Sequence, residues 1–192
     1  MVILLVTTLS WAGTAVAEPL ECTEDHFGET IHSDLVVPTG EVCRIQNSEV
    51  FGTITVSPGS RLVVNRSTVN GSILATDASV QILQDNHVTH NVVTRRPQPV
   101  DGVLAFGLCR SAIGGSLIVR DTVGVQQLFI GTDQDFCLGN TIGGTLTYVN
   151  NQVAAHQRIM DNVIGGHLLC QGNAPPPEVS GNTVGGHTIG QC

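Results

Sequence analysis

Two acidic residues, Asp133 and Asp135, are best suited by type and spacing to carry out acid/base chemistry, and Asp121, Arg110 and Arg120 lie nearby. Paired carboxyl groups cleave glycosidic bonds, one protonating the leaving oxygen while the other activates water or attacks the sugar. The set would suit a polysaccharide hydrolase, or a lyase with Arg as its base, since the chain has no lysine. The simpler interpretation is a solvated loop with ordinary acids.

A second candidate is a metal site formed by His167 and His187, each of which follows a Gly-Gly pair in the same short motif. A metal site needs a third or fourth ligand, held by a second shell of hydrogen bonds. No such ligand is evident at the matching positions of the other motif copies, so the simpler interpretation is a polar ladder facing solvent. No G-x-S-x-G sequence frames a serine nucleophile either.

The element that would position these side chains is a repeated motif: an aliphatic residue, a variable one, a small one, a polar one and another apolar one. It occurs, for example, at residues 50–54 and 142–146. The third residue of each copy is Ser33, Gly52, Gly71, His90, Gly115, Gly144, Gly166 and Gly186. The successive spacings are 19, 19, 19, 25, 29, 22 and 20.

A period near 20 with short β-type segments predicts an all-β, single-domain parallel β-helix, a solenoid of about eight coils of roughly 19–22 residues. A leucine-rich repeat would need a Leu-x-x-Leu-x-Leu frame, which is missing. We expect a right-handed coil, the common form of such folds. The longer spacings predict two insertions within residues 94–140, where a catalytic site would most plausibly lie.

Further columns keep the same register. Asn or Ser recurs two residues before the leading aliphatic residue, at Ser48, Ser67, Asn86, Ser111, Asn140, Asn162 and Asn182. Stacked side chains of this kind can bond along the solenoid axis, as amide ladders do in cross-β stacks. Gly40, Gly59 and Ala78 predict a second turn column, and the double glycines of the later coils predict tight bends or close backbone approach.

The six cysteines predict three disulfides in an exported chain. Their positions relative to the repeat place successive cysteines in neighbouring coils. We therefore expect pairing in chain order: Cys22–Cys43, Cys109–Cys137 and Cys170–Cys192. The sequence contains no C-x-x-C pair of the kind that binds zinc, and no cofactor is expected.

Residues 1–17 are predicted to be a signal peptide, because an apolar run at 2–10 precedes the small-x-small sequence Ala15-Val16-Ala17. Residues 18–192 would then form the β-helix domain of a secreted or cell-surface protein. The apolar run is too short to span a bilayer, and no later segment is a candidate. A net charge of −8 argues against nucleic acid as a partner.

The closing stretch, NVIGGHLLCQGNAP at 162–175 and GNTVGG through GQC at 181–192, resembles the C-terminal signature of small exported actinobacterial β-helix-repeat proteins of unknown function. The likeness is specific over the last 31 residues and a matter of pattern before them. It implies fold and export, and it carries over no catalytic residue.

The sequence therefore favours an exported or cell-surface β-helix protein with a structural or binding role and no identifiable catalytic site. Its expected partner is cell-wall or extracellular polysaccharide. The alternative is a carbohydrate-active enzyme, a polysaccharide lyase or hydrolase, centred on Asp133, Asp135 and Arg110.

Overall fold

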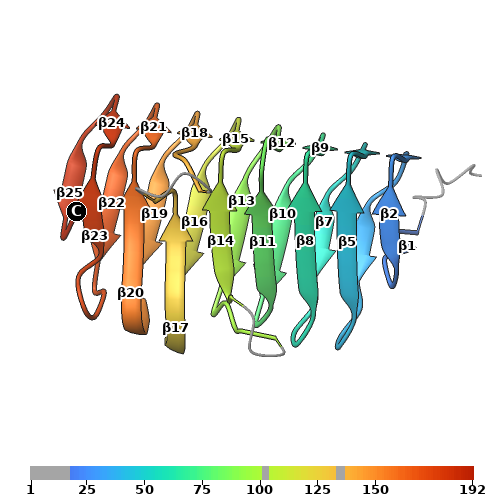
Figure 1. Cartoon of the computed structure of the whole chain (residues 1–192), viewed down its shortest axis with the longest axis horizontal. Coiled ribbons are helices and arrows are strands. Elements are labelled where there is room, and N and C mark those ends of the chain that lie inside the picture. Colours follow the sequence, from blue (N-terminus) through green and yellow to red (C-terminus); the bar gives the residue numbers. More distant parts are fainter. Residues whose placement is uncertain (1–17, 101–103, 133–136) are drawn as a thin grey trace, which may run out of the picture.

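A computed structural model describes residues 18–100, 104–132 and 137–192, so the expected signal peptide at 1–17 lies outside the described residues. The chain winds through three parallel sheets, here called A, B and C, visiting one strand of each sheet in every coil (Figure 1). Sheet C has eight strands within the described residues, and this confirms the eight coils. Within the same residues no helix is long and apolar enough to cross a membrane.

Each sheet takes every third strand of the chain. Sheet A contains β1 (Leu20–Glu21), β4 (Leu35–Val37), β7 (Ile54–Val56), β10 (Ile73–Thr76), β13 (Val92–Arg95), β16 (Leu117–Arg120), β19 (Leu146–Val149), β22 (Leu168–Gln171) and β25 (Thr188–Gly190). Sheet B contains β2 (Asp25–Phe27), β5 (Val42–Gln46), β8 (Arg61–Asn65), β11 (Ser79–Leu83), β14 (Phe106–Cys109), β17 (Val123–Ile130), β20 (Gln152–Met160) and β23 (Glu178–Ser180). Sheet C contains β3 (Thr30–Ile31), β6 (Glu49–Val50), β9 (Thr68–Val69), β12 (His87–Val88), β15 (Ala112–Ile113), β18 (Thr141–Ile142), β21 (Val163–Ile164) and β24 (Thr183–Val184).

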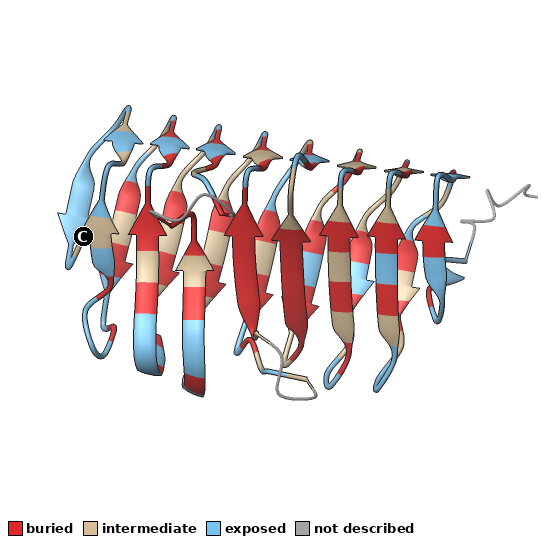
Figure 2. Cartoon of the chain, viewed as in Figure 1, coloured by how far each residue is buried: buried red, intermediate tan, exposed pale blue. Residues whose placement is uncertain are grey.

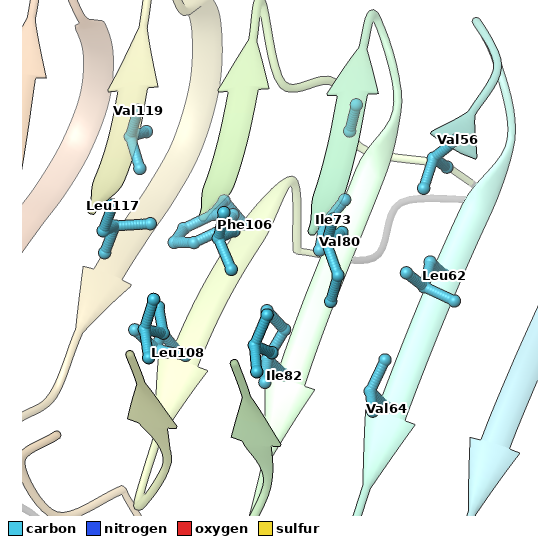
Figure 3. Packing of buried hydrophobic residues seen from close by; sticks show 14 of the residues in the cluster. Val56, Leu62, Val64, Ile73, Val80, Ile82, Phe106, Leu108, Leu117 and Val119 are labelled. Atoms are coloured by element: carbon cyan, nitrogen blue, oxygen red, sulfur yellow. The ribbon is translucent and has the colours of Figure 1, made fainter. Parts of the chain in front are cut away.

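The core consists of aliphatic columns that run along the solenoid axis. Because strand side chains alternate between faces, every second residue points inward and stacks on its equivalent in the next coil. Leu62, Val80 and Phe106 form one such column of sheet B, and they lie in the same core as Ile73 and Leu117 of sheet A (Figure 3). All five are completely buried, and each stabilises the fold by roughly 2 kcal/mol.

The three predicted disulfides are confirmed. Cys22–Cys43, Cys109–Cys137 and Cys170–Cys192 each join neighbouring coils, with Cα–Cα distances of 5.5, 4.7 and 5.3 Å. The first lies in the first two coils, the last lies in the final coils, and the middle one joins the end of β14 to Cys137 in the next coil. Three structural disulfides fit an oxidising compartment.

The end of the first insertion, at Leu104, covers part of the outer side of sheet B. The Leu104 carbonyl accepts hydrogen bonds from Ser79 Oγ and Gln81 Nε2, at 2.7 and 3.3 Å. A side chain at Gly107 would collide with the side chains of Leu104 and Phe129. As a result β11 and β14 are buried on both faces, unlike the other strands of sheet B (Figure 2).

The predicted turn column is present, with bends at Asp77 and Ala78, but its third copy is shifted by one residue. Gly40 and Gly59 adopt the left-handed conformation expected of them, with φ of 82° and 73°. In the next coil this conformation belongs to Asp77 (φ 53°), while Ala78 is buried. The reason is a one-residue slip: sheet A keeps a spacing of 19 from Ile54 to Ile73, but sheet B pairs Arg61 with Ser79, a spacing of 18.

Candidate functional site

The column that contains His167 and His187 is a hydrogen-bonded ladder on the outside of the solenoid. In every coil but the last, the side chain at this position accepts a bond from the backbone N–H of its equivalent in the following coil, as between Asp34 and Thr53 (2.7 Å) or Asn91 and Ser116 (2.8 Å). We call it the exposed ladder; its members are Asp34, Thr53, Ser72, Asn91, Ser116, Thr145, His167 and His187. The polar ladder expected from the sequence is thus present.

The two histidines end this ladder as a stacked pair. Their ring centroids are 5.4 Å apart and the rings are nearly parallel, with an interplanar angle of 9°. His167 Nδ1 accepts the backbone N–H of His187, so that nitrogen is committed to the ladder. Within the described residues no group of three or more His, Cys, Asp or Glu side chains could hold a metal ion.

The predicted Asn/Ser column forms a second, buried ladder between sheets B and C. Here the bonds run in the opposite direction, because the backbone N–H of each coil donates to the side chain of the following coil. Asn140 N–H donates to Asn162 Oδ1 and Asn162 N–H donates to Asn182 Oδ1, both at 3.0 Å. Asn162 Nδ2 also donates to the Ile130 carbonyl at 2.8 Å. We call this column the buried ladder.

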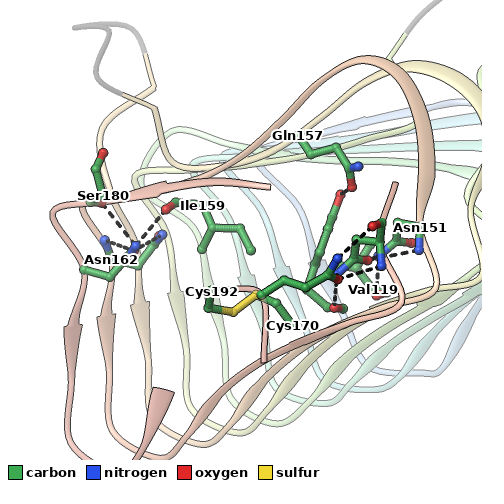
Figure 4. The surroundings of a disulfide bond; sticks show 12 residues. Val119, Asn151, Gln157, Ile159, Asn162, Cys170, Ser180 and Cys192 are labelled. Carbon is green, nitrogen blue, oxygen red and sulfur yellow. Dashed lines mark hydrogen bonds between the residues drawn. A yellow bond between two sulfur atoms is a disulfide. The ribbon is translucent and has the colours of Figure 1, made fainter. Parts of the chain in front are cut away.

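A third ladder, which the sequence analysis missed, lies at the turn from sheet A to sheet B in the later coils. Thr122, Asn151 and Asn173 donate in turn to Asn151 Oδ1, Asn173 Oδ1 and Gln191 Oε1, so the column ends beside the Cys170–Cys192 disulfide (Figure 4). Its first three residues repeat the motif spacings of 29 and 22, and that is the signal that could have revealed it.

The residues proposed for glycosidic chemistry are placed as follows. Arg110 occupies the turn after β14, where it forms an ion pair with Asp85 at 3.1 Å. Arg120 and Asp121 contact each other at 3.7 Å at the turn before β17, and Asp121 accepts a hydrogen bond from Asn150. Arg110 therefore lies at the end of a sheet B strand, whereas Asp121 lies at the beginning of one.

Two of these charged residues lie at turn positions with a left-handed backbone. Arg110 and Asp121 both have positive φ, 45° and 62°, and are parts of the solenoid's turns. Asp133 and Asp135 lie outside the described residues. The catalytic hypothesis therefore gains no assembled group of residues from the described part of the chain.

One ion pair of these turns shifts the ionisation of its members. Arg96 binds Asp77 with two hydrogen bonds of 2.7 Å. The hydrogen bonds from this guanidinium lower the pKa of Asp77, and the bonds to the carboxylate raise the pKa of Arg96. Inside the core, burial raises the pKa of Tyr148, whose hydroxyl donates to Gln157 Oε1 at 2.7 Å, so the phenol stays neutral.

The outer face of sheet A carries an aliphatic and threonine stripe that the sequence analysis did not identify. The register places one outward side chain of each coil directly above its equivalent. This stripe consists of Val36, Thr55, Leu74, Val93, Ile118, Thr147, Leu169 and Ile189. Leu74 and Ile189 are 40% and 46% exposed.

The stripe is continuous from β4 to β25. Its coils are spaced by about 4.8 Å, which makes the stripe roughly 35 Å long. The exposed ladder borders it on one side, two residues earlier in each coil. Soluble proteins rarely expose contiguous apolar patches without a partner, so this face is the leading candidate for an interaction surface. Its sequence signal is a column of residues three positions after each motif anchor.

A pocket of about 310 Å³ lies where the first insertion meets β17. It is lined by Pro99, Leu104, Ala105, Gly124, Val125, Gln126 and Gln127. Four of these residues are consecutive in β17, in the stretch where bulges shift its register with β20. Among the described residues that line this pocket, none is ionisable, so none could act as a catalytic acid or base.

No protein-family model, curated protein or solved structure matches this chain. The fold and the surfaces described above thus define its class, a disulfide-linked parallel β-helix with a stripe of aliphatic residues and threonine on one outer face.

Proposed function

We propose that the protein is a non-catalytic binding module, secreted or displayed at the cell surface, and that the outer face of sheet A binds an extended polysaccharide. The observation that carries this proposal is the stripe from Val36 to Ile189, in which eight successive strands, β4 to β25, contribute an aliphatic residue or threonine and no charge. The first strand of the sheet, β1, places Glu21 beside Val36. Three disulfides support a location outside the cytoplasm.

The chemistry of the stripe suits a sugar polymer. A pyranose ring has an apolar C–H face and a rim of hydroxyl groups, so an aliphatic track with polar margins complements it. Thr55 and Thr147 add hydroxyl groups within the track, and the exposed ladder adds polar groups along one edge. A linear array also favours a polymer over a small ligand, because each bound sugar raises the effective concentration of the next.

The size of the face argues against a stable dimer as its main use. A stripe about 35 Å long and one column of side chains wide covers a few hundred square ångströms, below the roughly 800 Å² per partner of a standard interface. A narrow polymer needs no larger contact.

The test is a binding panel of purified protein with insoluble and soluble polysaccharides, by co-sedimentation and affinity electrophoresis. Leu74→Asp and Ile118→Asp place a charge in the stripe and should weaken binding about tenfold. Val163→Asp is the matched control, because Val163 is 52% exposed but belongs to sheet C. It should bind as the unmodified protein does.

Two results would overturn the proposal. One is a protein that binds no polysaccharide of the panel, or whose stripe variants bind as tightly as the control. The other is release of cleaved sugar that Asp133→Ala or Asp135→Ala abolishes, which would make the protein an enzyme.

A further inference from the structure

Two arginines stand side by side at the margin of the stripe. The register of β13 and β16 pairs Arg95 directly with Arg120 on the outer face of sheet A. Neighbouring strands are about 4.8 Å apart, and like charges directly opposite one another destabilise a sheet. The chain therefore tolerates a local cost at this point of an otherwise regular solenoid.

Two outward arginines of sheet B have a carboxylate opposite them, whereas a third, Arg61, is paired in register with Val42 and Ser79. Arg44 is paired in register with Asp25, and Arg158 with Glu178, and both form ion pairs, at 3.0 and 3.1 Å. In each case a carboxylate occupies the position directly opposite the guanidinium. At the corresponding place in sheet A the opposite residue is a second arginine.

Within the described residues, only one carboxylate contacts this pair of arginines. Arg120 has one acidic contact, with Asp121 at 3.7 Å, and Asp121 also accepts a hydrogen bond from Asn150. Within the described residues the side chain of Arg95 has no hydrogen bond or ion pair, and Arg95 is exposed. The neighbouring Arg96 is bound to Asp77.

We propose that Arg95 and Arg120 bind a carboxylate of the ligand, so that the polysaccharide on sheet A contains uronic acid residues. Two adjacent guanidinium groups offer parallel N–H donors that match the two oxygens of a carboxylate. They lie two residues beyond Val93 and Ile118 along their strands, so both point to the same side of the sheet as the stripe. A sugar ring on the stripe would then present its carboxylate to the arginines. This inference rests on the proposed function.

The experiment compares one polyuronate with its carboxyl-reduced, neutral form. The Arg95→Gln, Arg120→Gln double variant should lose about tenfold in affinity for the polyuronate and keep its affinity for the reduced polymer. Arg44→Gln is the matched control, because it removes one outward positive charge from sheet B. Added salt should weaken polyuronate binding by the unmodified protein more than binding by the double variant.

The outcomes separate the two proposals. Equal affinity of the unmodified protein for both polymers, or an unaffected double variant, overturns the carboxylate site and leaves polysaccharide binding intact. Equal binding of a sulfated polymer without uronic acid also overturns the carboxylate assignment. Failure of both polymers to bind overturns this inference, and the wider panel then decides the proposed function separately.

Discussion

The Nδ1 atom of His167 accepts the backbone N–H of His187 at 2.9 Å, while the two imidazole rings lie stacked with centroids 5.4 Å apart. Asn91 Oδ1 makes the equivalent bond to Ser116 three coils earlier, at 2.8 Å. A histidine therefore replaces an amide in the exposed ladder without changing the bond that holds the coils together. For Nδ1 to accept, the ring proton must be on Nε2.

Replacing His167 with Phe should separate stacking from hydrogen bonding. Phe keeps an aromatic ring against His187 but leaves its backbone N–H without an acceptor, so we expect a loss of about 1 kcal/mol in unfolding free energy. His167→Asn supplies the acceptor used by Asn91 and should cost less than half as much. Urea unfolding measures both, and equal losses would contradict a role as acceptor.

Asn162 should be among the least replaceable polar residues. It is fully buried, accepts from both the backbone and the side chain of Asn140, and donates to the Ile130 carbonyl. Asn162→Ala would leave buried N–H and C=O groups unpaired and should cost about 3 kcal/mol. Asn162→Ser restores an acceptor, as in Ser67 and Ser111, and should recover part of the loss in denaturant unfolding. A Ser variant as unstable as Ala would argue against the ladder.

Substitutions at the double glycines should destabilise the fold, because an added side chain would collide with the backbone of the preceding coil. A Cβ at Gly143 would collide with the carbonyl of Gly114 in the preceding coil, and neither backbone can move without disturbing the stack. We expect Gly143→Ala to cost about 3 kcal/mol. Gly40→Ala is the control: its Cβ would meet nothing within 4 Å, and only its φ of 82° opposes the change, at about 1 kcal/mol. Thermal unfolding in which Gly40→Ala is the more damaging change would contradict this.

The Asp77–Arg96 ion pair should make stability depend on acidity. Because the folded-state pKa of Asp77 is lowered below 3.8, its contribution is present above the unfolded-state pKa and is lost as the pH falls through the folded-state value. Asp77→Asn should therefore lower the melting temperature at neutral pH and match the unmodified protein once the carboxyl is protonated in both states. Arg96→Gln should lower it in the same way at neutral pH. Melting curves across the acidic range test this; a difference that persists in strong acid would assign the effect to the turn itself.

Most of the fold follows from spacing, because a solenoid converts a sequence period directly into contact. Residues one motif apart, such as Ile54 and Ile73, are neighbours in sheet A, so columns of similar residues could be read as stacks. The cysteines obeyed the same rule, and neighbouring-coil positions were sufficient to pair them. The sequence period alone was therefore sufficient to predict which residues stack and which cysteines pair.

The sequence period could not predict how the residues of one coil are divided among its three strands and the turns between them. The third coil keeps 19 residues in sheet A but gives one fewer to the turn before β11, so Asp77 took the place predicted for Ala78. The register of Arg95 with Arg120 likewise crosses the first insertion. Recognising that pair required aligning the residues five positions after His90 and Gly115, on strands whose outward faces had not been assigned.

The candidate site was harder to predict because its members are not reactive residues. Asp133 and Asp135 drew attention by chemical type, whereas Leu74 and Ile118 matter only by being exposed in line. Aliphatic residues in a β repeat are normally assigned to the core. The alternation of faces along each strand is what distinguishes Leu74 from its buried neighbours Ile73 and Ala75.

The opposite directions of the two ladders beside sheet C have a consequence for how this architecture can change in size. Each coil donates one backbone N–H forward to the buried ladder and one backward to the exposed ladder. Ser, Thr, Asn, Asp and His all serve as acceptors. A duplicated coil would therefore find both of its partners already in place, as would the coils on either side of it. The solenoid can therefore gain or lose whole coils without loss of these hydrogen bonds, while its loops change independently.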